Sequence, residues 1–209
     1  MTKKRFKKSL NITGISLIFI IILTFNVFAQ SKKEIATLSG GCFWSMETMF
    51  QRLKGVSSVQ SGFAGGFVKN PSYDEVCTGK TGHAETIQVT FDPDKISYQK
   101  ILQVFWKVHN PTTLNRQGND DGTQYRSAIF YHNKKQREIA EKSKIAEAKS
   151  GHWGTDPIVT EINVYTNFYK AEAYHKDYYN KHTEQPYCES VITPKVEKFT
   201  KEFRNLLKE

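Results

Sequence analysis

Residues 84–91, AETIQVTF, alternate between apolar and polar side chains and form the clearest strand pattern in the sequence. Ile87, Val89 and Phe91 share one parity, and the polar residues between them take the other. This period of two is typical of a strand with one buried face. Glu85 falls on the apolar parity, so the pattern points a carboxyl group at the core.

Helices and strands follow one another on both sides of this strand. Toward the N-terminus, the sequence predicts strands at 35–38 and 56–63, with a helix from Cys42 to about Leu53 between them. Toward the C-terminus, Ser97 begins a helix that ends before Asn110-Pro111. We then expect strands at 127–132 and 158–164, helices at 134–150, 170–181 and from Thr193 onward, and loops at 69–82 and 112–124.

This mixture of elements predicts an α+β fold. We expect a two-layer sandwich with a ferredoxin-like core, in which helices flank a mixed or mainly antiparallel sheet. The 209 residues are enough for one main domain with its own hydrophobic core.

A separate segment precedes this domain. It has a basic head with five Lys or Arg residues, an apolar run over about 15–28, and the ending Val27-Phe28-Ala29. These features are typical of a signal peptide cleaved after Ala29. The sequence therefore predicts a signal peptide at 1–29, a single domain at 30–209, and export to the periplasm or another extracytoplasmic site. The alternative is that the segment stays uncleaved as a membrane anchor.

Removal of this segment changes the charge of the chain. The formal net charge is +9, and five of the positive charges lie in the first 29 residues, so the remainder carries about +4. That balance does not predict nucleic-acid binding. The chain has three cysteines, Cys42, Cys77 and Cys188, an odd number that fits a redox-active thiol better than a purely structural disulfide framework.

Cys42 is the candidate nucleophile. It follows Gly40-Gly41 at a predicted turn from strand to helix, where free N–H groups and the helix dipole favour a thiolate. Phe43 and Trp44 come next and are placed to form an apolar pocket beside the sulfur. The alternative is a small buried cysteine among core aromatic residues.

Glu85 is the candidate acid. A carboxyl group on a buried strand face has a raised pKa, which suits a proton donor near neutral pH. The alternative is a glutamate at a frayed, hydrated strand end. Tyr73 and Tyr125 lie in the two polar loops, where a phenol can donate a hydrogen bond to a polarised oxygen, and Asp120 lies in the second loop.

A zinc site is not expected. His83-Ala84-Glu85 matches half of a zinc deaminase motif, but the Pro-Cys-x-x-Cys half does not occur in the chain. We therefore expect no metal ligands, and a structural role for His83.

Taken together, these segments resemble the A-type peptide methionine sulfoxide reductases over essentially the whole chain after the leader. Gly41-Cys42-Phe43-Trp44 resembles the nucleophile motif of that family, and residues 73–79 with 81–85 resemble its acid motif. Residues 115–120 with 124–127 resemble a third motif, and Ala171-Glu172 with Tyr174-His175 a weaker fourth. Ser45 stands where the family often has glycine, and Gln185-Pro186-Tyr187-Cys188 matches only loosely.

The resemblance implies a role for each candidate. Cys42 would be the nucleophile, Glu85 the proton donor, and Tyr73 and Tyr125 the groups that bind the sulfoxide oxygen. Phe43 and Trp44 would hold the substrate's methyl group, and Asp120 would support the site through hydrogen bonds. The substrate would be the S epimer of methionine sulfoxide, both in oxidised proteins and as the free amino acid. The reaction would need no cofactor.

Recycling of the enzyme needs a second thiol. Cys42 would become a sulfenic acid, Cys188 would condense with it to a disulfide, and a thioredoxin-like protein would reduce that disulfide. We expect Cys188 to lie in a polar segment that can swing, Cys77 to be a buried bystander, and the protein to be a monomer. Two rival hypotheses remain: a thiol peroxidase that uses Cys42, and a non-catalytic binding module with an incidental cysteine.

Overall fold

The computed structural model describes Thr2 and residues 32–208. The signal peptide predicted at 1–29 therefore lies, apart from Thr2, outside the described residues. Residues 32–208 form one compact unit. In the part of the chain that the structure describes, no helix combines the length and apolar character needed to cross a membrane.

The centre of the fold is an antiparallel sheet of four strands. These are β1 (Glu34–Ser39), β2 (Val56–Ala64), β3 (Ala84–Phe91) and β6 (Ala128–Tyr131). They lie in the order β6-β1-β3-β2, and α1 (Phe43–Phe50) and α3 (Tyr98–Val108) provide the two crossovers. This βαββαβ arrangement is the ferredoxin-like core that the sequence predicts.

Two edge strands extend this sheet. β7 (Glu161–Val164) pairs in parallel with β6, and β8 (Phe168–Lys170) pairs antiparallel with β2. The six-stranded sheet is therefore mixed, as expected.

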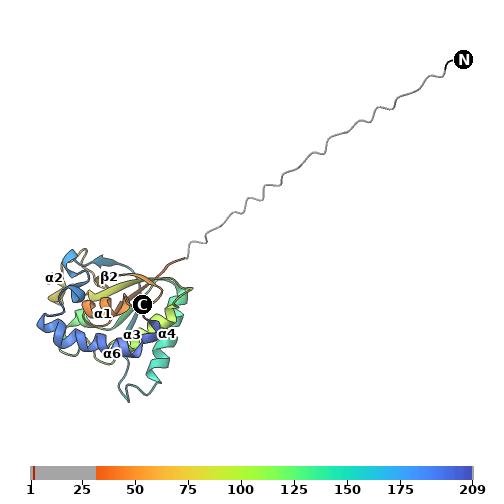
Figure 1. The fold of residues 1–209 in the computed structure, drawn as a ribbon. Helices are drawn as coiled ribbons and strands as arrows, with labels where there is room; N and C mark the ends of the chain where they lie inside the picture. The colour runs from red at the N-terminus through yellow and green to blue at the C-terminus, as the bar shows by residue number, and fades with distance from the viewer. Residues whose placement is uncertain (1, 3–31, 209) are drawn as a thin grey trace. The chain divides into compact units, whose positions relative to one another are not determined.

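The helices cover the sheet and contact one another (Figure 1). α1 packs on β2 and β3, and α6 (Thr193–Glu202) contacts α1. α4 (Lys134–Ala148) packs on α3 and on β6. The strand residues Ile87, Val89 and Phe91 are fully buried between these layers.

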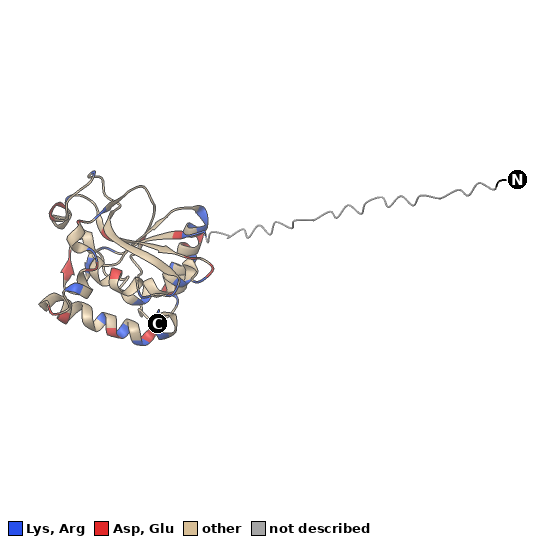
Figure 2. Ribbon diagram, turned by 45° about the horizontal axis from the view of Figure 1, so that its top comes forward, with Lys and Arg blue, Asp and Glu red and all other residues tan. Residues whose placement is uncertain are grey.

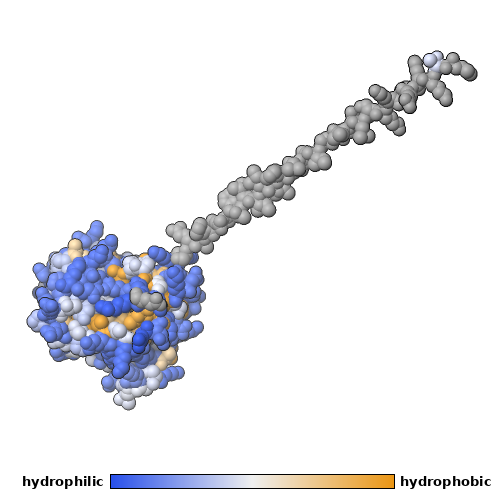
Figure 3. All heavy atoms as spheres, in the orientation of Figure 1, coloured by the Kyte–Doolittle hydropathy of each residue, from blue (hydrophilic) through white to orange (hydrophobic). Residues whose placement is uncertain are grey.

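Charges of both signs are interspersed along the ribbon (Figure 2), unlike the basic stripe of a nucleic-acid-binding surface. In the view of Figure 3, hydrophilic residues make up most of the domain's visible face, and apolar atoms gather in one region near its centre.

Three predicted segments differ from the structure. The loop expected at 69–82 contains α2 (Tyr73–Cys77), which begins with a capping box between Ser72 and Glu75. The loop at 112–124 contains the hairpin of β4 (Arg116–Gln117) and β5 (Asp120–Asp121), and the 3-10 turn η1 (Thr123–Tyr125) begins at its end.

The prediction of a helix at 170–181 is wrong. That segment instead holds the end of β8, the 3-10 turn η2 (Ala173–His175) and a short α5 (Tyr178–Lys181). Lys170, the first residue of this segment, pairs with Gly62 of β2 at the sheet edge, and this pairing keeps it extended. Asp177, with φ +55°, then interrupts any helix before Tyr178.

Candidate active site

The turn between β1 and α1 places Cys42 at the first position before the helix. Gly41 has φ +84°, and a Cβ on it would lie 2.7 Å from Cγ of Gln117. The main-chain N–H of Asn110 donates to Oε1 of Gln117 at 2.9 Å, which fixes this side chain against the turn. The glycine is therefore required both by its backbone angle and by the close approach of Gln117.

The Cys42 side chain is buried, with 6% of the residue exposed. Burial raises the pKa of the thiol, and the charge of Glu85 raises it further. A hydrogen bond with the Tyr187 hydroxyl and those from the N–H groups of Trp44 and Ser45 act in the opposite direction but do not offset burial. Burial therefore disfavours the thiolate that the sequence predicts at this helix start.

Glu85 lies beside Cys42 and is the second cause, after burial, of the raised pKa of the thiol. The N–H of Phe43 donates to Oε2 of Glu85 at 2.9 Å, so the first N–H of the helix binds this carboxyl group. Glu85 is 1% exposed, and burial raises its pKa to about 8, against the bond from Phe43 and with a further contribution from Asp120. The predicted buried, uncharged acid is therefore present at neutral pH.

Aromatic rings surround the residues that follow Cys42. Phe43 is 1% exposed, and its ring lies 6.1 Å from that of Tyr73, measured between centroids. Trp44 is half-buried and stacks on Tyr178 at 3.8 Å, and its Nε1 donates to Nδ1 of His175 at 3.0 Å. The indole of Trp44 is thereby fixed on two sides.

Two phenols approach the acid from different loops. Tyr73 is the first residue of α2, and its N–H donates to Glu172 at 2.9 Å. Tyr125 ends η1. Burial raises the pKa of both hydroxyl groups, and the charge of Glu85 is the next cause for each. Both phenols are therefore neutral donors that share one electrostatic environment with Glu85.

Asp120 acts on the site through a residue that the sequence analysis missed. The hydroxyl of Tyr187 donates to Oδ2 of Asp120 at 2.7 Å, and the same hydroxyl hydrogen-bonds the sulfur of Cys42. His175 and Tyr178, which hold Trp44, were also not predicted as site residues. The positions of Tyr187 beside Cys188 and of His175 in the fourth motif were the available signals.

Both remaining cysteines lie in surroundings different from those expected. Cys188 is 0% exposed and belongs to a π-helical turn (Cys188–Ile192) that packs in the hydrophobic core, so the prediction of a mobile polar segment is wrong. Cys77 is exposed at the end of α2, so the prediction of a buried bystander is also wrong. All three thiols are free.

His83 has a structural role, as expected. Its Nδ1 accepts from the N–H of Gly66 at 3.1 Å, and its Nε2 bonds the carbonyl of Val68 at 2.7 Å. Within residues 32–208, no group of three or more His, Cys, Asp or Glu side chains is placed to hold a metal ion. A cavity of about 340 Å³, lined by Gln117, Trp153 and Phe199 among others, contains none of the predicted site residues.

The fold and this arrangement define a thiol-based oxidoreductase, with a buried sulfur, a neutral carboxyl group and two phenols beside aromatic side chains. The model of the family "Peptide methionine sulfoxide reductase" matches residues 34–207. The chain therefore belongs to the peptide methionine sulfoxide reductase family, and it is an enzyme that reduces methionine sulfoxide.

Individual relatives agree with this assignment. The "Peptide methionine sulfoxide reductase MsrA" of Saccharolobus solfataricus is 54% identical over 176 residues, which cover 84% of this chain and 97% of the relative. The protein of the same name from Sulfolobus acidocaldarius is 54% identical over 171 residues, covering 81% and 95%.

Solved structures show the same fold. Methionine sulfoxide reductase A of Corynebacterium diphtheriae has a TM-score of 0.68 at 34% identity, over 74% of this chain and 77% of that one. Reduced Mxr1 from Saccharomyces cerevisiae has a TM-score of 0.67 at 35% identity, over 76% and 91%.

Proposed function

We propose that the protein reduces the S epimer of methionine sulfoxide, mainly within oxidised proteins, through a sulfenic acid on Cys42. The observation that carries this proposal is the neutral Glu85 carboxyl group, bonded to the N–H of the residue after Cys42. In this proposal its proton is available to the oxygen of a sulfoxide that Phe43 and Trp44 hold beside Cys42.

The chemistry needs a proton on Glu85. The sulfur of Cys42 loses its proton and bonds to the sulfoxide sulfur, and the sulfur–oxygen bond breaks as the oxygen leaves as water with one proton from Glu85 and one from the thiol. A water molecule then attacks the sulfur of Cys42, the sulfur–sulfur bond breaks, methionine leaves, Cys42 becomes a sulfenic acid, and the proton released by the water returns to Glu85. Tyr73 and Tyr125 donate hydrogen bonds to the sulfoxide oxygen as its charge develops.

Asp120 and Tyr187 complete the surroundings of the sulfur. Because the Tyr187 hydroxyl donates its single proton to Asp120 and also hydrogen-bonds Cys42, Asp120 orients the hydroxyl oxygen that faces the thiol. Its role in this proposal is therefore to position another side chain rather than to contact the substrate.

Cys188 is the proposed resolving thiol. It follows Tyr187, whose hydroxyl already reaches Cys42, so the two cysteines belong to neighbouring segments. Because Cys188 is fully buried, the π-helical turn must open before the disulfide with Cys42 forms. A thioredoxin-like protein then reduces this disulfide by thiol exchange. We further propose that the protein is exported after cleavage of its leader and acts as a monomer in repair of oxidised proteins.

A stereospecific assay tests this function. The purified protein is incubated with the S and R epimers of a methionine sulfoxide peptide in the presence of dithiothreitol, and released methionine is measured. We expect turnover of the S epimer alone, and none with Cys42→Ser. Faster loss of the Cys42 thiol with hydrogen peroxide than with the S epimer would favour the thiol peroxidase instead.

A further inference from the structure

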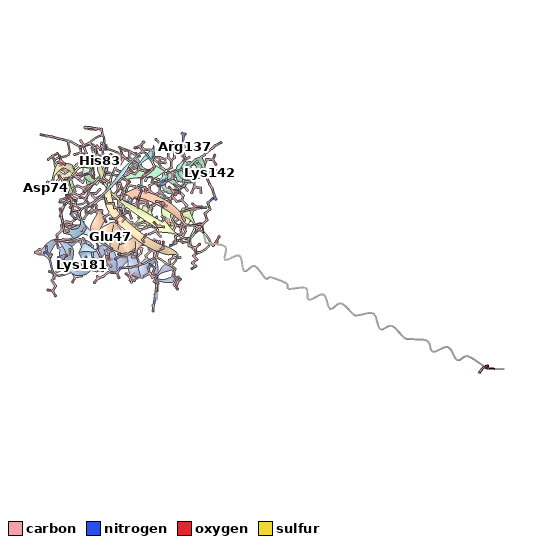
Figure 4. All side chains as sticks on the ribbon, turned by 90° about the horizontal axis from the view of Figure 1, so that it is seen from above. Glu47, Asp74, His83, Arg137, Lys142 and Lys181 are labelled. Atoms are coloured by element: carbon pink, nitrogen blue, oxygen red, sulfur yellow. The ribbon has the colours of Figure 1, made fainter. Side chains whose placement is uncertain are left out.

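Glu47 is a buried acid on α1 that the mechanism above does not use. It lies one turn after Trp44, and 3% of the residue is exposed. Figure 4 labels it close to Lys181, the last residue of α5. Its Oε2 accepts a hydrogen bond of 3.1 Å from the main-chain N–H of Asp177.

Asp177 has a backbone conformation that needs such support. Its φ of +55° is in the left-handed region, which costs free energy for a residue other than glycine and persists where neighbouring contacts enforce it. Besides the bond to Glu47, its Oδ1 accepts from Nε2 of Gln51 at 3.0 Å and from Nδ2 of Asn180 at 2.6 Å. Two side chains, Glu47 on α1 and Gln51 directly after its last residue, therefore hold this turn.

The residues on either side of Asp177 are those that hold Trp44. His175, two positions before, accepts the bond from Nε1 of Trp44, and Tyr178, the next residue, stacks on the indole with an interplanar angle of 10°. Helix α1 thus carries Trp44 and also, one turn later, the carboxyl group that fixes the clamp formed by His175 and Tyr178.

We propose that Glu47 is a positioning residue for the reaction: it fixes the turn at Asp177 and so keeps His175 and Tyr178 in place around Trp44. This inference rests on the proposed role of Trp44 in holding the substrate's methyl group. Burial raises the pKa of Glu47 to about 7, against the bond from Asp177. Because a carboxyl oxygen accepts this bond in either protonation state, the clamp needs the acceptor and not the charge.

The test compares Glu47→Ala with Glu47→Gln, which keeps an acceptor oxygen. The protein is labelled with 5-fluorotryptophan, and the resonance of Trp44 is assigned by its loss in Trp44→Phe. We expect Glu47→Ala to shift and broaden this resonance and to lower kcat/KM for the S sulfoxide by about tenfold to a hundredfold, the scale for a misplaced substrate contact. Glu47→Gln should restore both.

A matched control separates positioning from loss of stability. Gln136 on α4 is also 3% exposed and bonds the main-chain groups of His132 and Ile35, so Gln136→Ala removes a comparable buried support. Figure 4 labels its neighbour Arg137 at the edge of the domain, apart from Glu47. We expect Gln136→Ala to lower Tm and leave the Trp44 resonance and kcat/KM unchanged.

Three results would overturn the inference: an unshifted Trp44 resonance in Glu47→Ala, no recovery in Glu47→Gln, or equal losses of kcat/KM in Gln136→Ala at the same Tm. The fluorine resonance is read without substrate. A clamp that fails is therefore distinguishable from a failure of the proposed reductase activity, which the wild-type assay with the S epimer tests.

Discussion

At the scale of single residues, the site favours the uncharged forms of its two central groups, the Cys42 thiol and the Glu85 carboxyl group. Cys42 and Glu85 are both buried, and burial raises the pKa of each, which favours the protonated form of both groups at neutral pH. A protonated thiol reacts poorly with peroxide, because the thiolate is the nucleophile in that reaction. The thiolate is also the nucleophile toward a sulfoxide, so the thiol must lose its proton in either reaction. A sulfoxide oxygen leaves poorly unless it is protonated, and the raised pKa of Glu85 suits this group to supply that proton.

The proton on Glu85 predicts how the first chemical step depends on pH. We expect methionine release in a single turnover to fall as pH rises through about 8, because the acid then loses its proton. Glu85→Gln should be slower by about a hundredfold or more at pH 7 and lack this decline, since an amide gives no proton. Rapid-quench measurement of released methionine from pH 6 to pH 10 checks both. A wild-type rate that rises steadily to pH 10 would show that thiol ionisation controls the step instead.

At the scale of elements, the sequence pattern predicted those helices and strands whose formation depends on neighbouring residues in the chain. The alternation over 84–91 gives β3 with its bounds, and Ser97 caps α3 through a bond from the N–H of Lys100 at 3.1 Å. The segment 170–181 has helix-forming residues, but pairing with β2 and the bonds at Asp177 override them. The π-helical burial of Cys188 likewise depends on distant core residues that no local pattern reports.

The π-helical turn predicts a conformational step in recycling. Such turns are frequent at functional sites, and this one must open before Cys188 reaches Cys42. We expect Cys188→Ser to release one methionine per enzyme and then to stop with thioredoxin as donor, whereas the matched Cys77→Ser should continue. Hydrogen exchange of the amides at 188–192 should be faster in the oxidised wild type than in the reduced one. Full turnover by Cys188→Ser would assign recycling to Cys77 or to direct reduction of Cys42.

At the scale of the whole molecule, the site exists only in the folded domain. Cys42 lies in the turn that follows β1 and Glu85 near the start of β3, and these two central strands pair with each other. Tyr73, Tyr125 and Tyr187 come from segments outside that core. The family motifs in the sequence identified most of these residues, but only the tertiary structure joins Tyr187 to Asp120. Folding therefore brings a buried acid into the core at a cost that depends on pH.

That cost predicts how the stability of the molecule varies with pH. An unfolded glutamate has a pKa of 4.5 and folded Glu85 one of about 8, so the folded state holds this proton more tightly. The stabilising contribution of Glu85 is complete below about pH 4.5 and is lost as pH rises to about 8. Glu85→Gln carries no such proton, so relative to wild type it should gain on the order of a few kcal/mol in unfolding free energy between pH 5 and pH 9.

Urea unfolding of both proteins at pH 5, 7 and 9 measures this difference, and other titrating groups, such as buried His109, cancel in the comparison because both proteins contain them. Glu138→Gln is the control, because Glu138 is exposed on α4 and its carboxyl group lies 3.9 Å from Nζ of Lys134. We expect its unfolding free energy to follow that of wild type across the range. Parallel curves for wild type and Glu85→Gln would mean that Glu85 is ionised or hydrated in the folded protein, and the acid in the proposed mechanism would then have to be another group.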